Sequence, residues 1–173
     1  PTLEGLRTLY SRWCQRVPFD NVRKLIHVRQ GNSGPLPGVS APEFLKAWVR
    51  FGTGGTCWSG AGAFHTLLRA LGFEADRAVG TMLVAPNLPP NHGSVRVRMD
   101  HDQYLVDCSI LHGDPLRLCQ DAGTSIEHPA WGVQCTQRDA RWHVWWRPLH
   151  KTDGFECRLE HFGAPAEEFN TRH

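Results

Sequence analysis

The sequence lacks the marks of two large classes of protein. It contains no run of about 18 apolar residues, so we expect no segment that crosses a membrane. Its 19 basic and 17 acidic residues leave a formal net charge of only +2, whereas a nucleic-acid-binding protein usually carries a large basic excess. No signal peptide is visible at the N-terminus. We therefore expect a cytoplasmic protein that binds neither membranes nor nucleic acid.

Metal-site motifs are missing as well. Neither a C-x-x-C pair nor an H-E-x-x-H motif occurs among the six cysteines and ten histidines, so we expect no bound metal. The number of cysteines is even, but a chain of this size without a secretory signal favours reduced thiols over disulfides. The cysteines are Cys14, Cys57, Cys108, Cys119, Cys135 and Cys157.

What the sequence does contain is the pattern of one globular domain that begins with helices. Its 173 residues, 40% of them hydrophobic, are enough to bury a core. Apolar residues recur at helical spacing up to Pro18, where a first helix should end. Ser40 and Glu43 are spaced as a capping box for a second helix. A third helix is expected over residues 57–71, with Leu71 on its buried side.

After the third helix the apolar pattern changes to the two-residue period of strands. The segments SVRVRM and QYLVDC flank a polar turn at residues 100–102 and predict a β-hairpin. The segments WGVQCTQ, RWHVWW and FECRLEHF predict further strands. Helices followed by strands indicate an α+β fold with an antiparallel sheet or barrel. We expect a helical subdomain at residues 1–72 and a β subdomain at residues 73–173, joined in one compact unit.

One cysteine lies in an unusual context, the segment GTGGTCWSGAGAF at residues 52–64. Cys57 follows Gly55 and Thr56 and opens the predicted third helix. Unpaired backbone N–H groups and the helix dipole at that end stabilise a thiolate, which is the reactive form of cysteine. The same N–H groups can hold the oxyanion that forms when a thiolate attacks a carbonyl. A buried structural cysteine at a tight turn is the alternative.

A histidine and an aspartate come together at the open end of the predicted hairpin. A tight turn near Asp100 pairs residues whose numbers sum to about 200, and His92 and Asp107 satisfy this sum. A thiolate nucleophile needs a histidine to exchange protons with it and a carboxylate to orient that histidine. The sequence therefore predicts a catalytic triad of Cys57, His92 and Asp107.

Two motifs resemble the arylamine N-acetyltransferases. The GG-x-C-aromatic turn, the histidine and the aspartate of YLVD are similar to that family's catalytic residues. The segment VPFDN at residues 17–21 is similar to the family's IPFEN segment. The resemblance covers roughly residues 1–110, and the rest of the chain resembles the family more weakly. It implies a core like that of cysteine proteases and transglutaminases.

The resemblance also implies an acyltransferase with a Cys-His-Asp triad. Cys57 would attack the thioester of acetyl-CoA or of another acyl donor, and an amine would then take the acyl group. His92 would relay protons, and Asp107 would hold the ring of His92. No cofactor would be tightly bound. The residues expected to line the substrate site are Phe19, Trp58 and Ile110.

The chain departs from the family at several positions near the cysteine. Thr53 stands where the family usually has Arg, Ser59 where it has Glu, and Ala61 where it has Asn. After Asp107 the chain reads CSIL in place of the family's VGFG. It also stops at His173, before the C-terminal lid that helps the family to enclose its site.

A diverged branch of the family, the amide synthases, uses the same triad on acyl chains that carrier proteins hold. A shorter and more open site would suit a large acyl group, and a partner subunit or a dimer would be one way to complete it. Basic residues among the first thirty positions would suit an acidic carrier protein, although a solvated face is the alternative. These residues are Arg7, Arg12, Arg16, Arg23, Lys24 and Arg29.

Two other functions stay open at this point. With water as the acceptor, the triad would make a thiol hydrolase of amides or thioesters, which a site without a lid favours. The third possibility is a catalytically inactive binding protein, because Thr53, Ser59 and Ala61 change the residues that surround the nucleophile.

Overall fold

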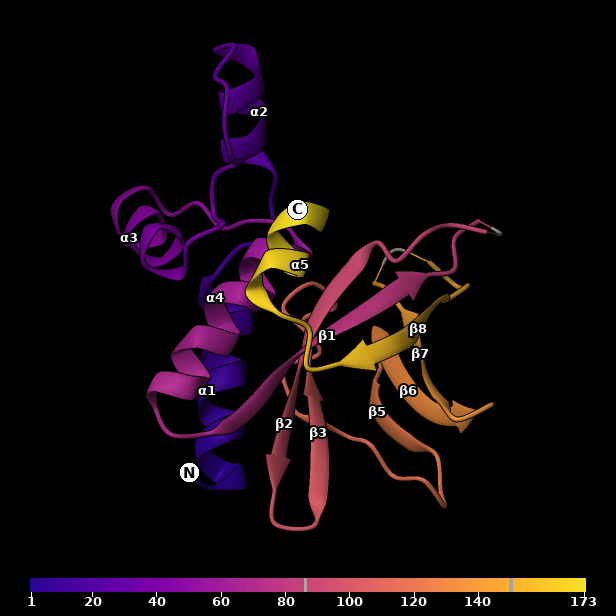
Figure 1. The fold of residues 1–173 in the computed structure, drawn as a ribbon. Helices are drawn as coiled ribbons and strands as arrows, with labels where there is room; N and C mark the ends of the chain where they lie inside the picture. Colours follow the sequence, from indigo (N-terminus) through magenta and orange to yellow (C-terminus); the bar gives the residue numbers. More distant parts are fainter. Residues whose placement is uncertain (86, 150) are drawn as a thin grey trace.

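The structure is a computed structural model that describes residues 1–85, 87–149 and 151–173. Helices form a layer against one side of a strongly curved sheet, and one helix, α2, projects away from that layer (Figure 1). The elements, in chain order, are α1 (Leu3–Arg16), α2 (Val22–Arg29), α3 (Ala41–Phe51), α4 (Cys57–Ala70), β1 (Glu74–Met82), β2 (His92–Met99), β3 (Asp102–Val106), β4 (Leu116–Arg117), β5 (Thr124–His128), β6 (Trp131–Arg138), β7 (Arg141–Arg147), β8 (Phe155–Phe162) and α5 (Ala166–Arg172).

The first helix, α1, shows how the sequence sets an element and its buried face. The Thr2 hydroxyl accepts a hydrogen bond from the Gly5 N–H at 3.1 Å and so caps the helix. Leu6, Tyr10 and Trp13 recur at helical spacing and are all buried. The apolar stripe of α1 therefore faces the core, as the sequence predicted.

The second predicted helix is present as α3, but its expected capping box is not. Ser40 makes no side-chain hydrogen bond at the helix start. The Glu43 carboxylate instead accepts a hydrogen bond from the Gly38 N–H at 2.7 Å and pairs with Arg23 of α2. The prediction of a capping box was wrong, because Glu43 ties α3 to α2 and to the loop between them. Gly52 ends the helix with a φ of 68°, which suits glycine.

The sequence analysis did not predict α2 as a separate helix. None of its residues is buried. Its apolar residues Val22, Leu25, Ile26 and Val28 are between 44% and 67% exposed. They do not form a stripe against the core, and such a stripe is the signal by which sequence patterns reveal a helix.

The helix α4 crosses the middle of the helical layer. Phe64 and Leu68 on it are fully buried. Leu71 was expected on the same side, but the helix ends at Ala70 and Leu71 is 48% exposed. That prediction was wrong because the chain turns toward β1 at Gly72, where φ is 85°.

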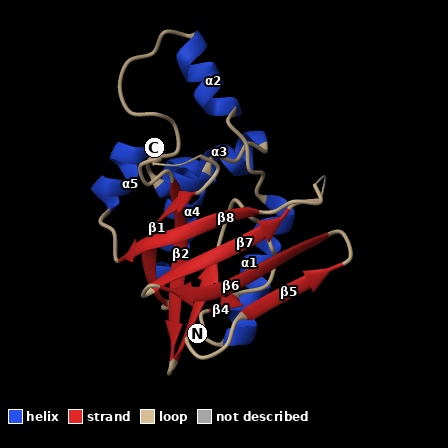
Figure 2. Ribbon diagram, turned by 90° about the vertical axis from the view of Figure 1, so that its right-hand side faces the viewer, coloured by secondary structure: helices blue, strands red, loops and turns tan. Residues whose placement is uncertain are grey.

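The described strands form one antiparallel sheet in the order β4-β3-β2-β1-β8-β7-β6-β5. Because β4 and β5, at the two ends of this order, also contact each other, the sheet curls into a nearly closed barrel (Figure 2). The predicted hairpin is β2–β3, with Val95 opposite Val106 and Met99 opposite Asp102. The three later predicted strands are β6, β7 and β8, whereas the short β4 and β5 were not predicted.

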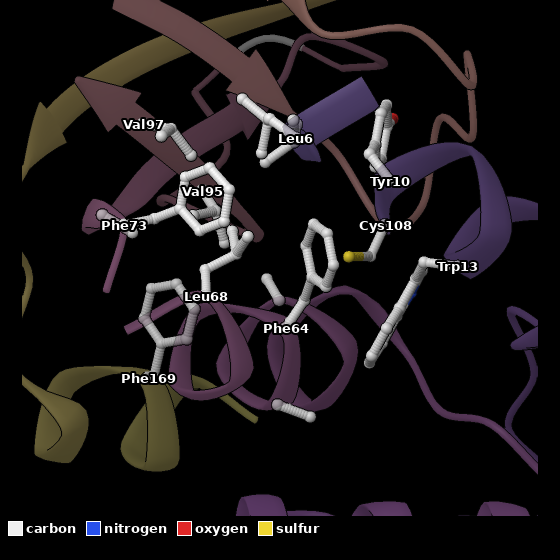
Figure 3. Close-up of a cluster of buried hydrophobic side chains, with 14 of the residues drawn as sticks. Leu6, Tyr10, Trp13, Phe64, Leu68, Phe73, Val95, Val97, Cys108 and Phe169 are labelled. Carbon is white, nitrogen blue, oxygen red and sulfur yellow. The ribbon is translucent and has the colours of Figure 1, made fainter. Parts of the chain in front are cut away.

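Two apolar clusters hold the fold together. The first lies between the helices and the sheet and includes Tyr10 of α1, Phe64 of α4 and Val95 of β2 (Figure 3). The second lies inside the barrel and includes Val133 of β6 and Val144 of β7. Burial of these side chains is the main favourable contribution to folding.

The α+β fold class, with helices first and an antiparallel barrel or sheet after them, is confirmed. At the end of the chain, α5 returns to the helical layer, where Phe169 packs against Trp58 of α4 with ring centroids 5.0 Å apart. The division of the chain at residue 72 into two subdomains stays a prediction. Among the described residues, no helix is long and apolar enough to cross a bilayer.

Candidate active site

Cys57 is the first residue of α4, and the turn before it is built around glycine. Gly54 has no room for a side chain, because a Cβ there would lie 1.7 Å from the Pro18 carbonyl oxygen. The Gly54 N–H donates a hydrogen bond to Asp20 Oδ2 at 2.7 Å. The Asp20 N–H in turn donates to the Gly55 carbonyl oxygen at 3.1 Å. The VPFDN segment and the cysteine turn therefore form one hydrogen-bonded unit.

The small side chain of Ser59 fits a space that backbone closes on two sides. A Cβ on Gly38 would lie 2.8 Å from the Ser59 Cβ, and a Cβ on Gly55 would lie 2.3 Å from its Oγ. The Ser59 hydroxyl donates a hydrogen bond to the Thr56 carbonyl oxygen at 3.2 Å. A longer side chain at this position would have to displace the loop before α3.

His92 and Asp107 meet because they lie at adjoining ends of two neighbouring strands. His92 opens β2, and Asp107 directly follows β3. His92 Nε2 lies 2.6 Å from Asp107 Oδ2, and the two residues are only 4% and 1% exposed. Since Asp107 bonds Nε2, a hydrogen bond between this ring and Cys57 involves Nδ1. The structure thus brings together the predicted pair.

Two other parts of the chain hold Asp107 in place. The Tyr10 hydroxyl of α1 donates a hydrogen bond to the Asp107 carbonyl oxygen at 2.7 Å and accepts one from its N–H at 3.1 Å. The backbone N–H groups of Ser109 and Ile110 donate to Asp107 Oδ1 at 2.8 and 3.0 Å. Both carboxylate oxygens and both backbone polar atoms of Asp107 are therefore bonded, which orients the carboxylate toward His92.

The protonation states of the three side chains depend on one another. Burial lowers the pKa of His92, but the charge and the hydrogen bond of Asp107 raise it well above its ordinary value. Burial raises the pKa of Asp107, but the charge and hydrogen bond of His92 hold it well below its usual range. Burial also raises the pKa of Cys57, yet the hydrogen bond and charge of His92 and the Gly93 N–H lower it overall. The site therefore favours a thiolate–imidazolium pair.

The lowered pKa of Cys57 contrasts with the raised pKa of four other cysteines. Burial raises the pKa of Cys14 to about 11 and that of Cys157 to about 11. Burial raises the pKa of Cys135 to about 12, and that of Cys108 well above its ordinary value. A lowered thiol pKa is the property of a reactive cysteine, whereas a raised one is typical of a packed thiol.

The surroundings of the Cys57 sulfur include two residues that the sequence analysis did not assign. Sγ lies 3.9 Å from the Asn91 carbonyl oxygen, and Asn91 is fixed by its Oδ1, which accepts a hydrogen bond from the Met82 N–H at 2.8 Å. Burial lowers the pKa of Lys24 of α2, and the charge of Cys57 opposes that shift. The Lys24 ammonium therefore lies within electrostatic range of the sulfur. The sequence analysis named Lys24 only as one of the basic residues among the first thirty positions, and no pattern placed it beside Cys57.

Gly55 and Thr56, the residues expected to form an oxyanion turn, directly precede Cys57. Thr56 is extended and starts α4 without a side-chain cap. Its hydroxyl lies 3.5 Å from His173 Nδ1 instead. The first N–H groups of α4 are therefore not taken by a capping side chain, and they stand next to the sulfur.

Phe19 and Ile110, both expected at the substrate site, line one cavity of about 430 Å³. Phe19 is 49% exposed, and its backbone pairs with Gly55 beside the cysteine turn. Trp131 of β6 and Trp146 of β7 line the same cavity. The alternation of apolar and polar residues in the sequence did not assign these tryptophans to a substrate site. The curvature of the barrel decides which tryptophans reach the cavity. The other lining residues are Ser109, Leu111, Pro148 and Leu149.

Trp58, the third residue expected at the substrate site, does not line this cavity. It is 6% exposed and packs against Gly93, where a Cβ would lie 2.6 Å from the indole ring. It also packs against Phe169 of α5. One edge of Trp58 reaches a separate cavity of about 720 Å³ together with Asn91. The structure thus gives Trp58 a packing position between α4, β2 and α5.

Comparison with known proteins assigns the chain to a family. A family model described as N-acetyltransferase matches residues 2–142. The arylamine N-acetyltransferase / N-hydroxyarylamine O-acetyltransferase of Salmonella typhimurium is 25% identical over 174 residues. The arylamine N-acetyltransferase of Escherichia coli is 24% identical over 165 residues. The matches cover 93% and 87% of this chain but 59% and 55% of these relatives, so the chain spans little more than half of their length.

Solved structures of arylamine N-acetyltransferases share the fold. The enzyme from M. tuberculosis matches with a TM-score of 0.78 at 20% identity, and the Mycobacterium marinum enzyme in complex with CoA with 0.79 at 21%. Each of these two matches covers 99% of this chain and 64% of the other. A Bacillus cereus enzyme with a Cys-His-Glu triad matches with a TM-score of 0.77 at 17% identity, over 99% of this chain and 67% of the other. Because the family model matches most of its length, the chain belongs to the arylamine N-acetyltransferase family.

Proposed function

We propose that this protein transfers an acyl group from a thioester donor to an amine through Cys57. The observation that supports this most strongly is a thiol with a lowered pKa beside a buried His92–Asp107 pair whose atoms lie 2.6 Å apart. The names of the relatives point to an acetyl group and an arylamine acceptor, and the CoA complex of the Mycobacterium marinum enzyme supports acetyl-CoA as the donor.

In the first half of the reaction, the Cys57 thiolate attacks the carbonyl carbon of the thioester and forms a new carbon–sulfur bond. Negative charge builds up on the carbonyl oxygen, and the N–H groups at the start of α4 donate hydrogen bonds to it. The carbon–sulfur bond of the donor then breaks, and the leaving thiolate takes the proton of the His92 imidazolium. The products are an acyl-cysteine, the free thiol of the donor and a neutral His92.

In the second half, an amine nitrogen attacks the carbonyl carbon of the acyl-cysteine. Neutral His92 takes the proton that the amine gives up as the amide bond forms. The bond to the Cys57 sulfur breaks, and the thiolate is restored beside the protonated ring. Asp107 stays ionised throughout and keeps the ring in place.

The cavity of about 430 Å³ is the proposed place of the acceptor. Its wall is formed mainly by Phe19, Ile110, Trp131 and Trp146, so it suits the apolar ring of an aromatic amine. The Phe19 backbone pairs with Gly55 beside the cysteine turn, which supports a position of this cavity near the acyl group. A larger acyl group on a carrier protein is the alternative donor. The carrier, a partner subunit or dimer and a cytoplasmic location stay predictions.

Hydrolysis of the acyl-cysteine is a second candidate function. Phe19 is 49% exposed, so solvent reaches the wall of the acceptor cavity. Water that enters this cavity competes with the amine for the acyl group. The relative rates of the two reactions decide between a transferase and a thiol hydrolase.

The test is the intact mass of the protein after a brief exposure to acetyl-CoA. One acetyl group should appear on the protein, and it should be absent from Cys57→Ala. Cys119→Ala removes another partly buried thiol and should keep the acetyl group. An added arylamine should discharge the adduct, and an equal discharge rate without the amine would identify a hydrolase.

A second set of results would contradict the proposed acyl transfer. If neither acetyl-CoA nor a panel of longer acyl thioesters gives an adduct, and Cys57 is alkylated no faster than the other thiols, the proposal is wrong. The protein would then be a binding protein on an acyltransferase fold.

A further inference from the structure

We propose that the end of α5 sets the position of Cys57 relative to His92, with His173 and Arg172 as positioning residues. Cys57 and His92 lie on different elements, α4 and β2, so the distance between them depends on how these elements are held together. Arg172 is the last residue of α5, and His173 follows it. The inference rests on the proposed function, because it concerns the two residues that would carry out the acyl transfer.

His173 lies against the cysteine turn. Its Nε2 lies 3.0 Å from the Pro37 carbonyl oxygen, and its Nδ1 lies 3.5 Å from Thr56 Oγ1. Thr56 directly precedes Cys57. The space left between His173, Pro37 and the turn measures only about 10 Å³, at the lower limit for one water molecule. The His173 ring therefore packs directly between the cysteine turn and the loop before α3.

The protonation state of His173 suits these two partners. Burial lowers the pKa of His173, the hydrogen bond with the Pro37 carbonyl opposes this shift, and the charge of Lys24 lowers the pKa further, so that it lies below its ordinary value. The ring is therefore neutral at neutral pH, with one N–H donor and one acceptor nitrogen. Because a carbonyl oxygen only accepts, Nε2 carries the proton, and Nδ1 is the acceptor for the Thr56 hydroxyl.

Arg172 holds the segment that leads into His92. Its Nη1 donates a hydrogen bond to the Pro90 carbonyl oxygen at 3.2 Å. Its Nε donates to Glu168 Oε1 at 3.0 Å, and this contact within α5 orients the guanidinium group. Arg172 therefore fixes the backbone two residues before the predicted proton-transfer histidine.

The residue after Pro90 contacts the nucleophile itself. The Asn91 carbonyl oxygen lies 3.9 Å from Cys57 Sγ. The Asn91 N–H donates a hydrogen bond to the Gly80 carbonyl oxygen at 3.0 Å. Hence β1 holds Asn91 from one side, and Arg172 holds Pro90 from the other.

Contacts with other helices fix α5 in this place. It has seven residues, too few for a stable isolated helix, so its position depends on the rest of the fold. It lies beside α4, where Phe169 is 3% exposed and packs against Trp58 with ring centroids 5.0 Å apart (Figure 1). The Lys24 ammonium of α2 donates a hydrogen bond to the His173 carbonyl oxygen at 2.7 Å. The end of α5 is thus held between α2, α4 and the cysteine turn.

His173→Ala tests the position of Cys57 without changing a charge. The ring is neutral, and alanine keeps the backbone carbonyl group that Lys24 bonds. A displaced turn would weaken the hydrogen bond from His92 that lowers the pKa of Cys57. The midpoint pH for alkylation of Cys57 by iodoacetamide should therefore rise. Acetylation at saturating acetyl-CoA should slow roughly tenfold, because small displacements of reacting groups cost large factors in rate.

His173→Gln is the rescue variant, because an amide also has an N–H donor and an acceptor. It should restore the wild-type midpoint and most of the acetylation rate. Arg172→Ala should slow acetylation as His173→Ala does, since it releases the segment before His92. Asn170→Ala, at an exposed position of α5, is the matched control and should change neither the midpoint nor the rate.

Urea denaturation of each variant separates a positioning role from a loss of stability. An unchanged alkylation midpoint and acetylation rate in folded His173→Ala would overturn the inference, whatever free energy of unfolding is lost. A glutamine variant that behaves like the alanine variant would also overturn it, because hydrogen bonds would then not hold the turn. If His173→Ala does not fold, Thr56→Val removes the same contact from the other side and should raise the midpoint.

Alkylation distinguishes a failure of this inference from a failure of the proposed function, because iodoacetamide needs no acyl donor. A wild-type protein that no thioester acetylates would contradict the proposed acyl transfer, while the alkylation midpoints would still decide the role of His173. Normal acetylation of the wild-type protein, His173→Ala and Arg172→Ala would support the proposed function and overturn the positioning role.

Discussion

The Tyr10 side chain and the Asp107 backbone exchange two hydrogen bonds, one in each direction, at 2.7 and 3.1 Å. The two residues are 97 positions apart, and both are buried. This contact joins the first helix to the loop after β3. It therefore couples the docking of α1 to the position of the carboxylate that orients His92.

Tyr10→Phe should reduce both stability and activity. It leaves the buried N–H and carbonyl groups of Asp107 without their partner, which costs about 1–3 kcal/mol of the free energy of unfolding. Urea denaturation measures this loss. Tyr104→Phe is the matched control, because its hydroxyl makes a weaker contact with Asp102 at 3.3 Å, and it should change the free energy little. Equal effects of the two substitutions would contradict the role of Tyr10.

Asp107→Asn should move thiolate formation at Cys57 to higher pH. The charge of Asp107 raises the pKa of His92, so its removal lowers that pKa, and Cys57 loses the imidazolium that lowers its own pKa. In the wild-type protein the rate of alkylation by iodoacetamide should rise with pH at a midpoint below the ordinary thiol range. In the variant this midpoint should lie higher. An unchanged midpoint would show that Asp107 does not control the charge of the pair.

Gly54→Ala should disrupt the cysteine turn. The new Cβ would lie 1.7 Å from the Pro18 carbonyl oxygen, so the backbone has to move. We expect a loss of about 1–3 kcal/mol or more in the free energy of unfolding and a loss of Cys57 acetylation. Gly62→Ala is the control within α4, where the nearest atom to a Cβ is 3.9 Å away. It should keep activity and raise stability by about 0.5–1 kcal/mol, because alanine favours a helix interior.

Leu111→Gly should stabilise the protein and enlarge the acceptor cavity. Leu111 has a φ of 56°, a conformation that costs a side chain free energy and that glycine adopts readily. Thermal denaturation should show a gain of up to about 1 kcal/mol, and larger amines should become acceptors. Leu149→Gly lines the same cavity but has no such strain, so it should not stabilise. A loss of stability in Leu111→Gly would show that its side-chain packing outweighs the strain.

The pairing of His92 with Asp107 could be predicted from sequence because it depends on local features. Alternating strands and a tight turn fix the register of a hairpin, and the register places the two residues at its open end. The position of Cys57 at a helix start is likewise local, since glycines before it and an apolar stripe after it are visible in the sequence.

The parts that could not be predicted depend on contacts between distant segments. Tyr10 was visible only as part of an apolar stripe, because the partner of its hydroxyl is set by how α1 docks. The packing of Trp58 against Gly93 and Phe169 could not be predicted, because it depends on how β2 and α5 dock against α4. The helix α2 was not predicted because its apolar side chains do not pack into the core.

The lack of buried residues in α2 has a consequence for its motion. A segment without buried contacts opens at a low free-energy cost, so its amide hydrogens should exchange with solvent much faster than those of α4. The helix that carries Lys24 would then fluctuate around a rigid cysteine turn.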